Sequence, residues 1–229
     1  MISMQFRAFL RCLNQLVLGA RSKGQERTKV KKSSSKRDAS LRIAALCGVI
    51  SPITGFALLS LAVFRSPWFS WTGDYLSDLG TRGDDASMLF NSGLITGGIL
   101  STLFAIGLRE GPLLSSSPLG RLGALALILG SCAVWAIGVF PLETGATHTY
   151  AARAFFTLIP FSLLLIGAGM MTSAEKGLGL FSLIMGVVTV VVALIPWPWD
   201  GGAIPQMLSV LPLSAWSVVL GIGLLMRLK

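Results

Sequence analysis

Charged side chains are scarce in this chain of 229 residues. Only 13% of the residues are charged and 53% are hydrophobic, whereas a soluble domain usually has about 25% charged and about 45–50% apolar residues. This balance excludes an ordinary soluble enzyme. It also excludes a disordered chain, which requires low hydrophobicity and high charge. The remaining class is a protein that crosses a membrane several times.

Cysteine and histidine are also rare, with three cysteines and one histidine, His148. The cysteines are scattered without CxxC spacing, which argues against a disulfide framework or a thiolate zinc site. A single histidine is fewer than most catalytic zinc sites use. The sequence also lacks a GxSxG elbow, a phosphate-binding loop and a dinucleotide fingerprint in its usual context. These motifs therefore supply no complete catalytic set.

Long apolar runs, by contrast, fill the chain after its first 41 residues. Each run is close to the ~20 residues that one membrane crossing requires. Each must be helical, because lipid offers no partner for an unpaired backbone N–H or C=O group. The predicted fold class is therefore all-α, a six-helix transmembrane bundle in residues 42–229. The spans are expected at about 42–64, 87–108, 120–140, 150–171, 178–196 and 206–226.

Residues 1–41 form a separate, strongly basic segment with ten lysines and arginines against two acidic residues. Apolar residues between Ile2 and Val17 recur at helical spacing, which favours a short amphipathic helix on a membrane surface. A tail without fixed structure is the alternative. Basic runs beside membrane spans usually serve orientation or bind anionic lipids. Membrane lipids are therefore the expected partners, and nucleic acid is not.

The basic residues also predict the orientation of the bundle. If the N-terminus is cytoplasmic, 16 of the 19 lysines and arginines lie on the inner side and six of the ten acidic residues lie outside. This distribution follows the positive-inside rule. We therefore expect a multi-pass protein of the cell membrane with both termini in the cytoplasm.

The expected outer face carries most of the informative polar groups. In the long first outer loop, residues 71–80 resemble a short interfacial helix closed by Gly80, which would place Asp74 and Asp78 on one face. A cation between two carboxylates would relieve their repulsion, although a solvated helix face is the simpler interpretation. We expect this loop to cover a polar outer pocket whose floor is the outer ends of the second, third and fourth spans.

His148 falls at the outer start of the fourth span, where an ionisable group indicates a functional site. It could pin a loop, act in catalysis, bind a metal or respond to pH. With Asp74 and Asp78 it gives a candidate set for a divalent metal, although no cofactor is firmly predicted. Ser77 joins these three residues as a candidate catalytic residue. The candidate binding residues are Asn91, Glu143, Arg153 and Asp200.

Two short motifs resemble a family of membrane proteins. The first comprises residues 74–80 (DYLSDLG) and 89–94 (LFNSGL), and the second comprises residues 138–141 (GVFP), His148, Ala152, Phe155 and Phe156. This pattern resembles the family grouped as domain of unknown function 998, over about residues 42–225. The resemblance implies a six-helix integral membrane protein. It implies no established activity, so it assigns no role to any residue.

Three functions remain open at this stage. The leading hypothesis is a non-enzymatic membrane protein, a small binding, sensing or envelope-associated module. The first alternative is a membrane-embedded hydrolase or transferase, with or without a metal, that acts on lipid head groups. The second alternative is a small-solute transporter, although the spans contain no acidic residue or lysine at mid-depth.

Overall fold

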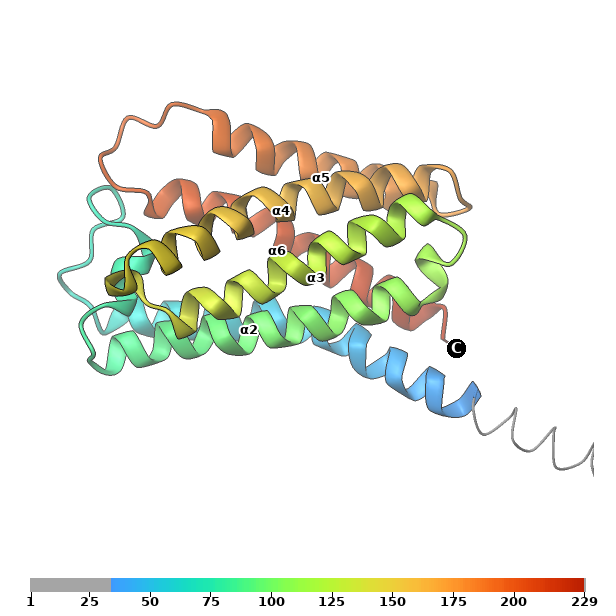
Figure 1. The fold of residues 1–229 in the computed structure, drawn as a ribbon, viewed down its shortest axis with the longest axis horizontal. Helices are drawn as coiled ribbons and strands as arrows, with labels where there is room; N and C mark the ends of the chain where they lie inside the picture. Colours follow the sequence, from blue (N-terminus) through green and yellow to red (C-terminus); the bar gives the residue numbers. More distant parts are fainter. Residues whose placement is uncertain (1–33, 229) are drawn as a thin grey trace, which may run out of the picture. The chain divides into compact units, whose positions relative to one another are not determined.

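Six long helices make up most of residues 34–228, the part of the chain that the computed structural model describes (Figure 1). Each is long and apolar enough to cross a membrane, which confirms the predicted six-helix transmembrane fold. The helices are the first helix Ser34–Phe64, α2 Asp85–Glu110, α3 Pro118–Val139, α4 Ala146–Met171, α5 Lys176–Leu194 and α6 Ala203–Met226. Three short 3-10 helices lie between them: η1 Leu76–Gly80, η2 Pro112–Leu114 and η3 Leu142–Thr144.

The predicted spans start later in the chain than the helices that the structure shows. The largest difference is in the first helix, which is already helical at Ser34, the first described residue, whereas its span was expected from about residue 42. Its first turns are charged, and a helix can continue past the apolar stretch that lies in lipid. The amphipathic helix predicted between Ile2 and Val17 lies outside the described residues.

Side chains and glycine define where the helices begin. Asp84 accepts a hydrogen bond from the Ser87 backbone N–H at 2.9 Å before α2, and the Ser117 hydroxyl accepts one from Gly120 at 3.0 Å before α3. Both are standard N-cap arrangements. Gly145, before α4, has φ +65°, a conformation that favours glycine.

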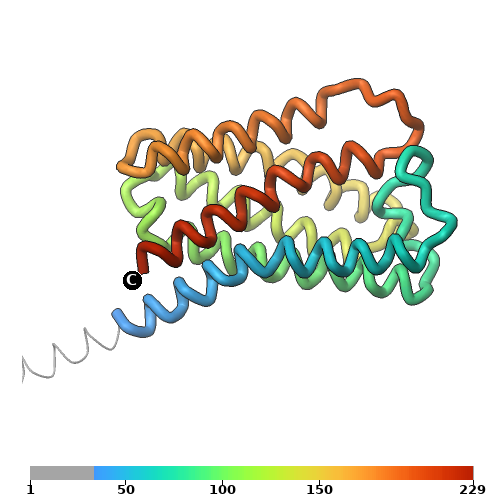
Figure 2. Tube along the Cα trace, turned by 180° about the vertical axis from the view of Figure 1, so that it is seen from behind, coloured from blue at the N-terminus to red at the C-terminus, as the bar shows by residue number. Residues whose placement is uncertain are grey.

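The helices of the compact unit that starts at Leu41 pack in chain order, and the first helix closes the ring by contacting both α2 and α6. Ser51 on the first helix lies 2.8 Å from the Ser101 hydroxyl oxygen on α2. Ser217 on α6 donates a hydrogen bond to the Gly48 carbonyl oxygen at 2.6 Å. Figure 2 shows the first helix and the C-terminal half of α6 side by side.

The two ends of this unit differ in their connections. One end, which we call the loop end, carries the three connections 65–84, 140–145 and 195–202. The other, the terminal end, carries the links 111–117 and 172–175 and the last described residues (Figure 1). At the terminal end Arg42 donates to the Leu228 carbonyl oxygen at 2.7 Å, so the first helix and the end of α6 meet there. An even number of crossings requires this arrangement.

Candidate functional site

Two connections join at the loop end. The Gly201 N–H donates to the Thr72 carbonyl oxygen at 2.9 Å, and the Ala203 N–H donates to the Asp74 carbonyl oxygen at 3.0 Å. A Cβ atom on Gly201 would lie 2.5 Å from the Asp74 backbone, so only glycine permits this approach. The segment after α5 therefore holds the long first loop against the start of α6.

Asp74 and Asp78 serve the backbone of their own loop. An Asp74 carboxylate oxygen accepts from the Ser70 N–H at 2.7 Å, and an Asp78 carboxylate oxygen accepts from the Tyr75 N–H at 2.7 Å. The helix expected over 71–80 is thus only the 3-10 helix η1, Leu76–Gly80. Asp74 lies before it, so the expected pairing of the two carboxylates on one helix face is wrong. The cause is the turn that Asp74 closes with Ser70.

The metal-ligand candidates are not gathered in this arrangement. Among residues 34–228, no group of three or more histidine, cysteine, aspartate or glutamate side chains lies close enough to hold a metal ion. The His148 side chain binds the Phe140 carbonyl oxygen instead. The donor set in this part of the chain therefore gives no support to a divalent metal bound by Asp74, Asp78 and His148.

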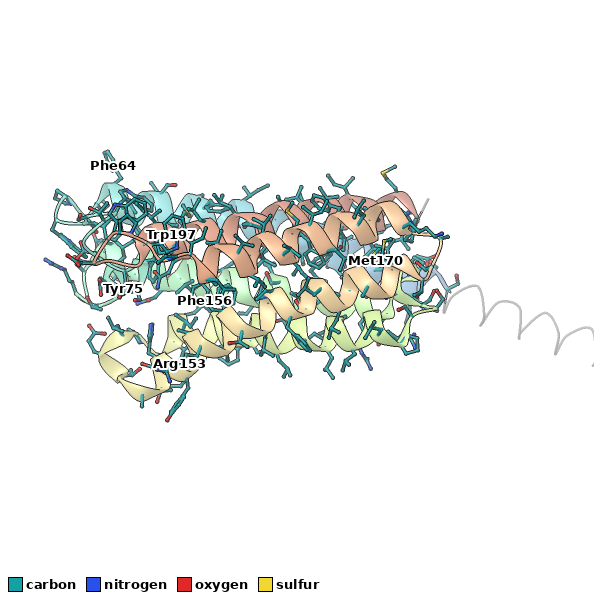
Figure 3. The ribbon with its side chains drawn as sticks, turned by 90° about the horizontal axis from the view of Figure 1, so that it is seen from above. Phe64, Tyr75, Arg153, Phe156, Met170 and Trp197 are labelled. Atoms are coloured by element: carbon teal, nitrogen blue, oxygen red, sulfur yellow. The ribbon has the colours of Figure 1, made fainter. Side chains whose placement is uncertain are left out.

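The other predicted binding residues occupy separate places. Asn91 on α2 donates through its side-chain amide to the Gly80 carbonyl oxygen at 3.1 Å, which fixes the end of η1. Glu143 and Asp200 are exposed in their connections, and Arg153 is exposed on α4. Figure 3 shows Arg153 in the loop-end half of the helix. Of these four residues, only Asn91 makes a contact that organises the loop end.

Asp84, which the sequence did not single out, has the clearest electrostatic perturbation outside the spans. Its carboxylate accepts from the Ser87 backbone N–H at 2.9 Å and from the Ser87 hydroxyl at 3.0 Å. These bonds, the backbone bond first, hold the pKa of Asp84 below its ordinary value. Asp84 is therefore a capping residue for α2.

A cavity of about 200 Å³ lies inside the bundle, between the first helix, α2, α3, α4 and α6. Leu76 and Ser77 of η1 line its loop end. Phe104 and Trp216, both fully buried, line it deeper in the bundle, where their rings pack edge to face with centroids 6.0 Å apart. The cavity thus extends from the loop end past the middle of the helices.

The lining of this cavity is mostly apolar. It includes seven phenylalanine, methionine and tryptophan side chains: Phe56, Phe90, Phe104, Phe155, Phe156, Met207 and Trp216. No aspartate, glutamate, lysine or arginine lies among the described residues that line it. The expected pocket was polar and formed by the second to fourth spans. The structure differs because ring closure brings apolar faces of the first helix and α6 to the same space.

His148 and Ser77 both line this cavity, and Asp74 and Asp78 do not. His148 is 5% exposed, and its Nδ1 lies 2.8 Å from the Phe140 carbonyl oxygen at the end of α3. A carbonyl only accepts, so Nδ1 carries the hydrogen. This bond pins the α3–α4 connection. It also leaves Nε2 as the acceptor of the neutral ring.

Gln206 is the lining residue that sequence reasoning missed. Its Oε1 accepts from the Leu76 N–H at 2.8 Å, which joins α6 to η1. Its contact partner lies 130 positions away in the sequence, so no local pattern marks it. One signal was available: Gln206 is the only glutamine after residue 41.

The residues of the two sequence motifs meet at the loop end. Asn91 binds Gly80, as described above, and a Cβ atom on Gly138 would lie 2.7 Å from the Asn91 carbonyl oxygen. Phe140, in the second motif, is the acceptor for His148. The motifs therefore describe one packed structure at the loop end of the cavity.

The family model described as "Protein of unknown function (DUF998)" matches residues 49–223, which is most of the chain. The chain belongs to DUF998. No curated protein and no solved structure matches it. DUF998 membership carries no activity, so the function of the cavity must be argued from its chemistry.

Proposed function

We propose that this DUF998 protein is a non-enzymatic binding module of the cell membrane that holds one small, neutral, lipid-like molecule in its central cavity. The observation that carries the proposal is the apolar cavity of about 200 Å³. An engineered apolar cavity of ~150 Å³ binds benzene. The space here is therefore sufficient for a compact apolar molecule or a segment of one lipid tail.

The size of the cavity also favours an occupant on energetic grounds. Side chains that line an unfilled apolar space lack contact partners on that side. A bound apolar molecule recovers the lost dispersion contacts. An ion is disfavoured because the lining offers no opposite charge.

We further propose that the loop end faces the outside of the cell and both termini face the cytoplasm. The support is the distribution of basic residues, 16 of 19 of which then lie on the cytoplasmic side. In this orientation, the basic residues 1–41 lie at the inner leaflet, where anionic lipids are their expected partners. The loop end of the cavity, with Ser77, His148 and Gln206, then lies towards the outer leaflet.

The test fills the cavity from a glycine. Gly55 lines the cavity, and a Cβ atom there would meet no heavy atom within 4 Å, so Gly55→Leu occupies the space without a backbone clash. Gly177→Leu is the matched control, because Gly177 is an exposed helical glycine with the same free space and does not line the cavity. Leucine also favours a helix over glycine at both positions.

The measurement is the amount of small molecule that co-purifies with the full chain in mild detergent, quantified by mass spectrometry. Wild type and Gly177→Leu are expected to carry the same neutral molecule near stoichiometry, and Gly55→Leu about tenfold less. Equal occupancy in all three proteins, or no bound molecule in wild type, would contradict the proposal.

A second candidate, a membrane-embedded hydrolase or transferase for lipid head groups, is favoured by one observation: Ser77 and His148 line the same cavity. It predicts turnover of a lipid that is lost in both Ser77→Ala and His148→Ala. A metal-dependent version predicts one metal ion per chain by elemental analysis, lost in Asp78→Ala. Turnover with this pattern would replace the binding proposal.

A further inference from the structure

The polar side chains of the cavity differ in kind along its length, and this difference names the class of ligand. Only serine hydroxyl groups line the cavity deeper in the bundle, from Ser51, Ser101, Ser131, Ser214 and Ser217, whereas the imidazole and the amide lie at its loop end. Ser77, His148 and Gln206 lie at its loop end, in η1 and in the first turns of α4 and α6. The Phe104–Trp216 pair lies at its deeper end. We propose, resting on the binding function above, that the ligand is a single-chain lipid alcohol whose hydroxyl group is held by His148 and Gln206.

His148 supplies a hydrogen-bond acceptor. Its Nδ1–H donates to the Phe140 carbonyl oxygen, and in the uncharged tautomer that makes this bond the lone pair is on Nε2. Nε2 has no hydrogen-bond partner among the described residues, although the side chain is 5% exposed and lines the cavity. A ligand that brings a donor to this atom therefore gains a hydrogen bond that the protein itself does not supply.

Gln206 supplies the complementary donor. The Leu76 N–H can only donate, so the oxygen of the Gln206 amide must face it, and the orientation of the amide is fixed. The amide nitrogen is left with two hydrogens and no partner in the part of the chain that the structure describes. The cavity therefore presents one fixed acceptor and one fixed donor in its loop-end half.

A hydroxyl group satisfies both. Its hydrogen donates to Nε2 of His148, and its oxygen accepts from the amide of Gln206. A hydrocarbon would leave both side chains unpaired, and a carboxylate or phosphate would bring a charge that no lining residue compensates. The apolar lining below accommodates the tail, which runs towards Phe104 and Trp216. Ser77, whose hydroxyl also lines the loop end, is a further partner for the same group.

Two substitutions each remove one ligand-binding group and keep the hydrogen bond that the side chain makes to the backbone of Phe140 or Leu76. In His148→Asn, the side-chain amide can replace Nδ1–H as donor to Phe140, but no acceptor reaches the position of Nε2. In Gln206→Glu, a carboxylate oxygen still accepts from the Leu76 N–H, but the N–H donors are lost. Thr149→Ser serves as a control, since Thr149 is exposed and absent from the lining.

The experiment uses the purified full chain in detergent and three probes of equal chain length: n-decanol, n-decane and decanoate. Wild type and Thr149→Ser are expected to bind decanol about tenfold more tightly than decane. A tenfold difference in affinity corresponds to the net contribution of about one hydrogen bond. Both His148→Asn and Gln206→Glu should lose this preference and keep their affinity for decane. Decanoate should bind more weakly than decanol.

The outcomes separate this inference from the function on which it rests. If decanol and decane bind wild type equally, and Gly55→Leu abolishes both, the cavity binds apolar molecules and the hydroxyl assignment is overturned. If decanoate binds best, the head group is a carboxyl and the assignment is likewise overturned. If no probe binds and the cavity holds only water, the binding function itself fails.

Discussion

The hydroxyl group of Ser217 on α6 donates a hydrogen bond of 2.6 Å to the Gly48 carbonyl oxygen of the first helix, the oxygen that Pro52 leaves without its helical partner. In a regular helix this oxygen would accept from the N–H four residues later, and proline has none. Ser217 is buried, so its hydroxyl satisfies a group that water does not reach. The bond closes the helical ring at a defect in the first helix.

This relationship predicts that the cost of Ser217→Ala depends on residue 52. In wild type, Ser217→Ala leaves the Gly48 carbonyl oxygen unpaired and should destabilise the protein by about 1–3 kcal/mol. In a Pro52→Ala background the helix regains its own N–H donor, so the same substitution should cost well under about 1 kcal/mol. The measurement is a double-mutant cycle of unfolding in detergent with increasing denaturant.

Ser214→Ala is a suitable control for that cycle, because Ser214 also lies on α6 but donates within its own helix, to Val210 at 2.9 Å. Its cost should be small and independent of residue 52. Additive costs for Ser217→Ala and Pro52→Ala would show that the two residues do not share the Gly48 oxygen.

Gly201 predicts a second sensitive position, at the loop end. A Cβ atom there would lie 2.5 Å from backbone atoms of Asp74, which cannot move as a flexible side chain can. Gly201→Ala should therefore destabilise the protein by about 1–3 kcal/mol, the usual cost of overpacking. Thermal unfolding in detergent checks this against Gly177→Ala, where the new methyl group meets nothing within 4 Å. Equal melting temperatures for the two variants would contradict the close approach.

The number and class of the helices could be predicted because the length of an apolar run and the demands of lipid depend on local sequence alone. The residues at which the helices begin and end could not be predicted in this way. The first helix is already helical at Ser34, the first described residue, because helix formation continues through charged residues outside the apolar run. The α4 helix starts at Ala146, before its apolar run, because the positive φ of Gly145 sets the turn.

The candidate site was only partly predictable, and the reasons differ between residues. His148 stood out because a lone ionisable group at a span is costly. The relation expected between Asp74 and Asp78 failed because a turn with Ser70 replaces the first part of the predicted helix. Gln206 was missed because its role depends on Leu76, which only tertiary packing brings close. Contacts of this kind have no signature in a single sequence.

Asp84 predicts a pH dependence of stability. Hydrogen bonds from Ser87 lower its pKa in the folded state, so the stabilisation is present above the unfolded pKa of about 3.9 and is lost as pH falls through the folded pKa. Asp84→Ala should therefore lower the melting temperature near neutral pH, and the difference from wild type should shrink in acid. A constant difference at all pH values would contradict the capping role.

Two ion pairs between different elements, Arg227–Glu175 and Arg65–Asp85, give the last prediction, because they should differ in strength. Arg227 at the end of α6 binds Glu175 before α5 through two nitrogens, with Nε donating to a carboxylate oxygen at 2.7 Å. The side chains are 34% and 22% exposed. Arg65 and Asp85 meet at a single distance of 3.9 Å and are 61% and 84% exposed. Burial and bidentate geometry strengthen an ion pair, whereas exposed pairs are worth little.

Glu175→Gln should therefore destabilise the protein by about 1 kcal/mol or more, since the replacement leaves the partly buried guanidinium without its counter-charge. Asp85→Asn should change the free energy of unfolding by less than about 0.5 kcal/mol. Because Glu175 precedes α5 and Arg227 ends α6, the loss should appear first as faster hydrogen exchange at the start of α5. Raising the salt concentration should weaken the Arg65–Asp85 pair more than the Arg227–Glu175 pair, since solvent ions screen exposed charges more effectively. Equal effects of the two substitutions at low salt would show that burial does not distinguish these pairs.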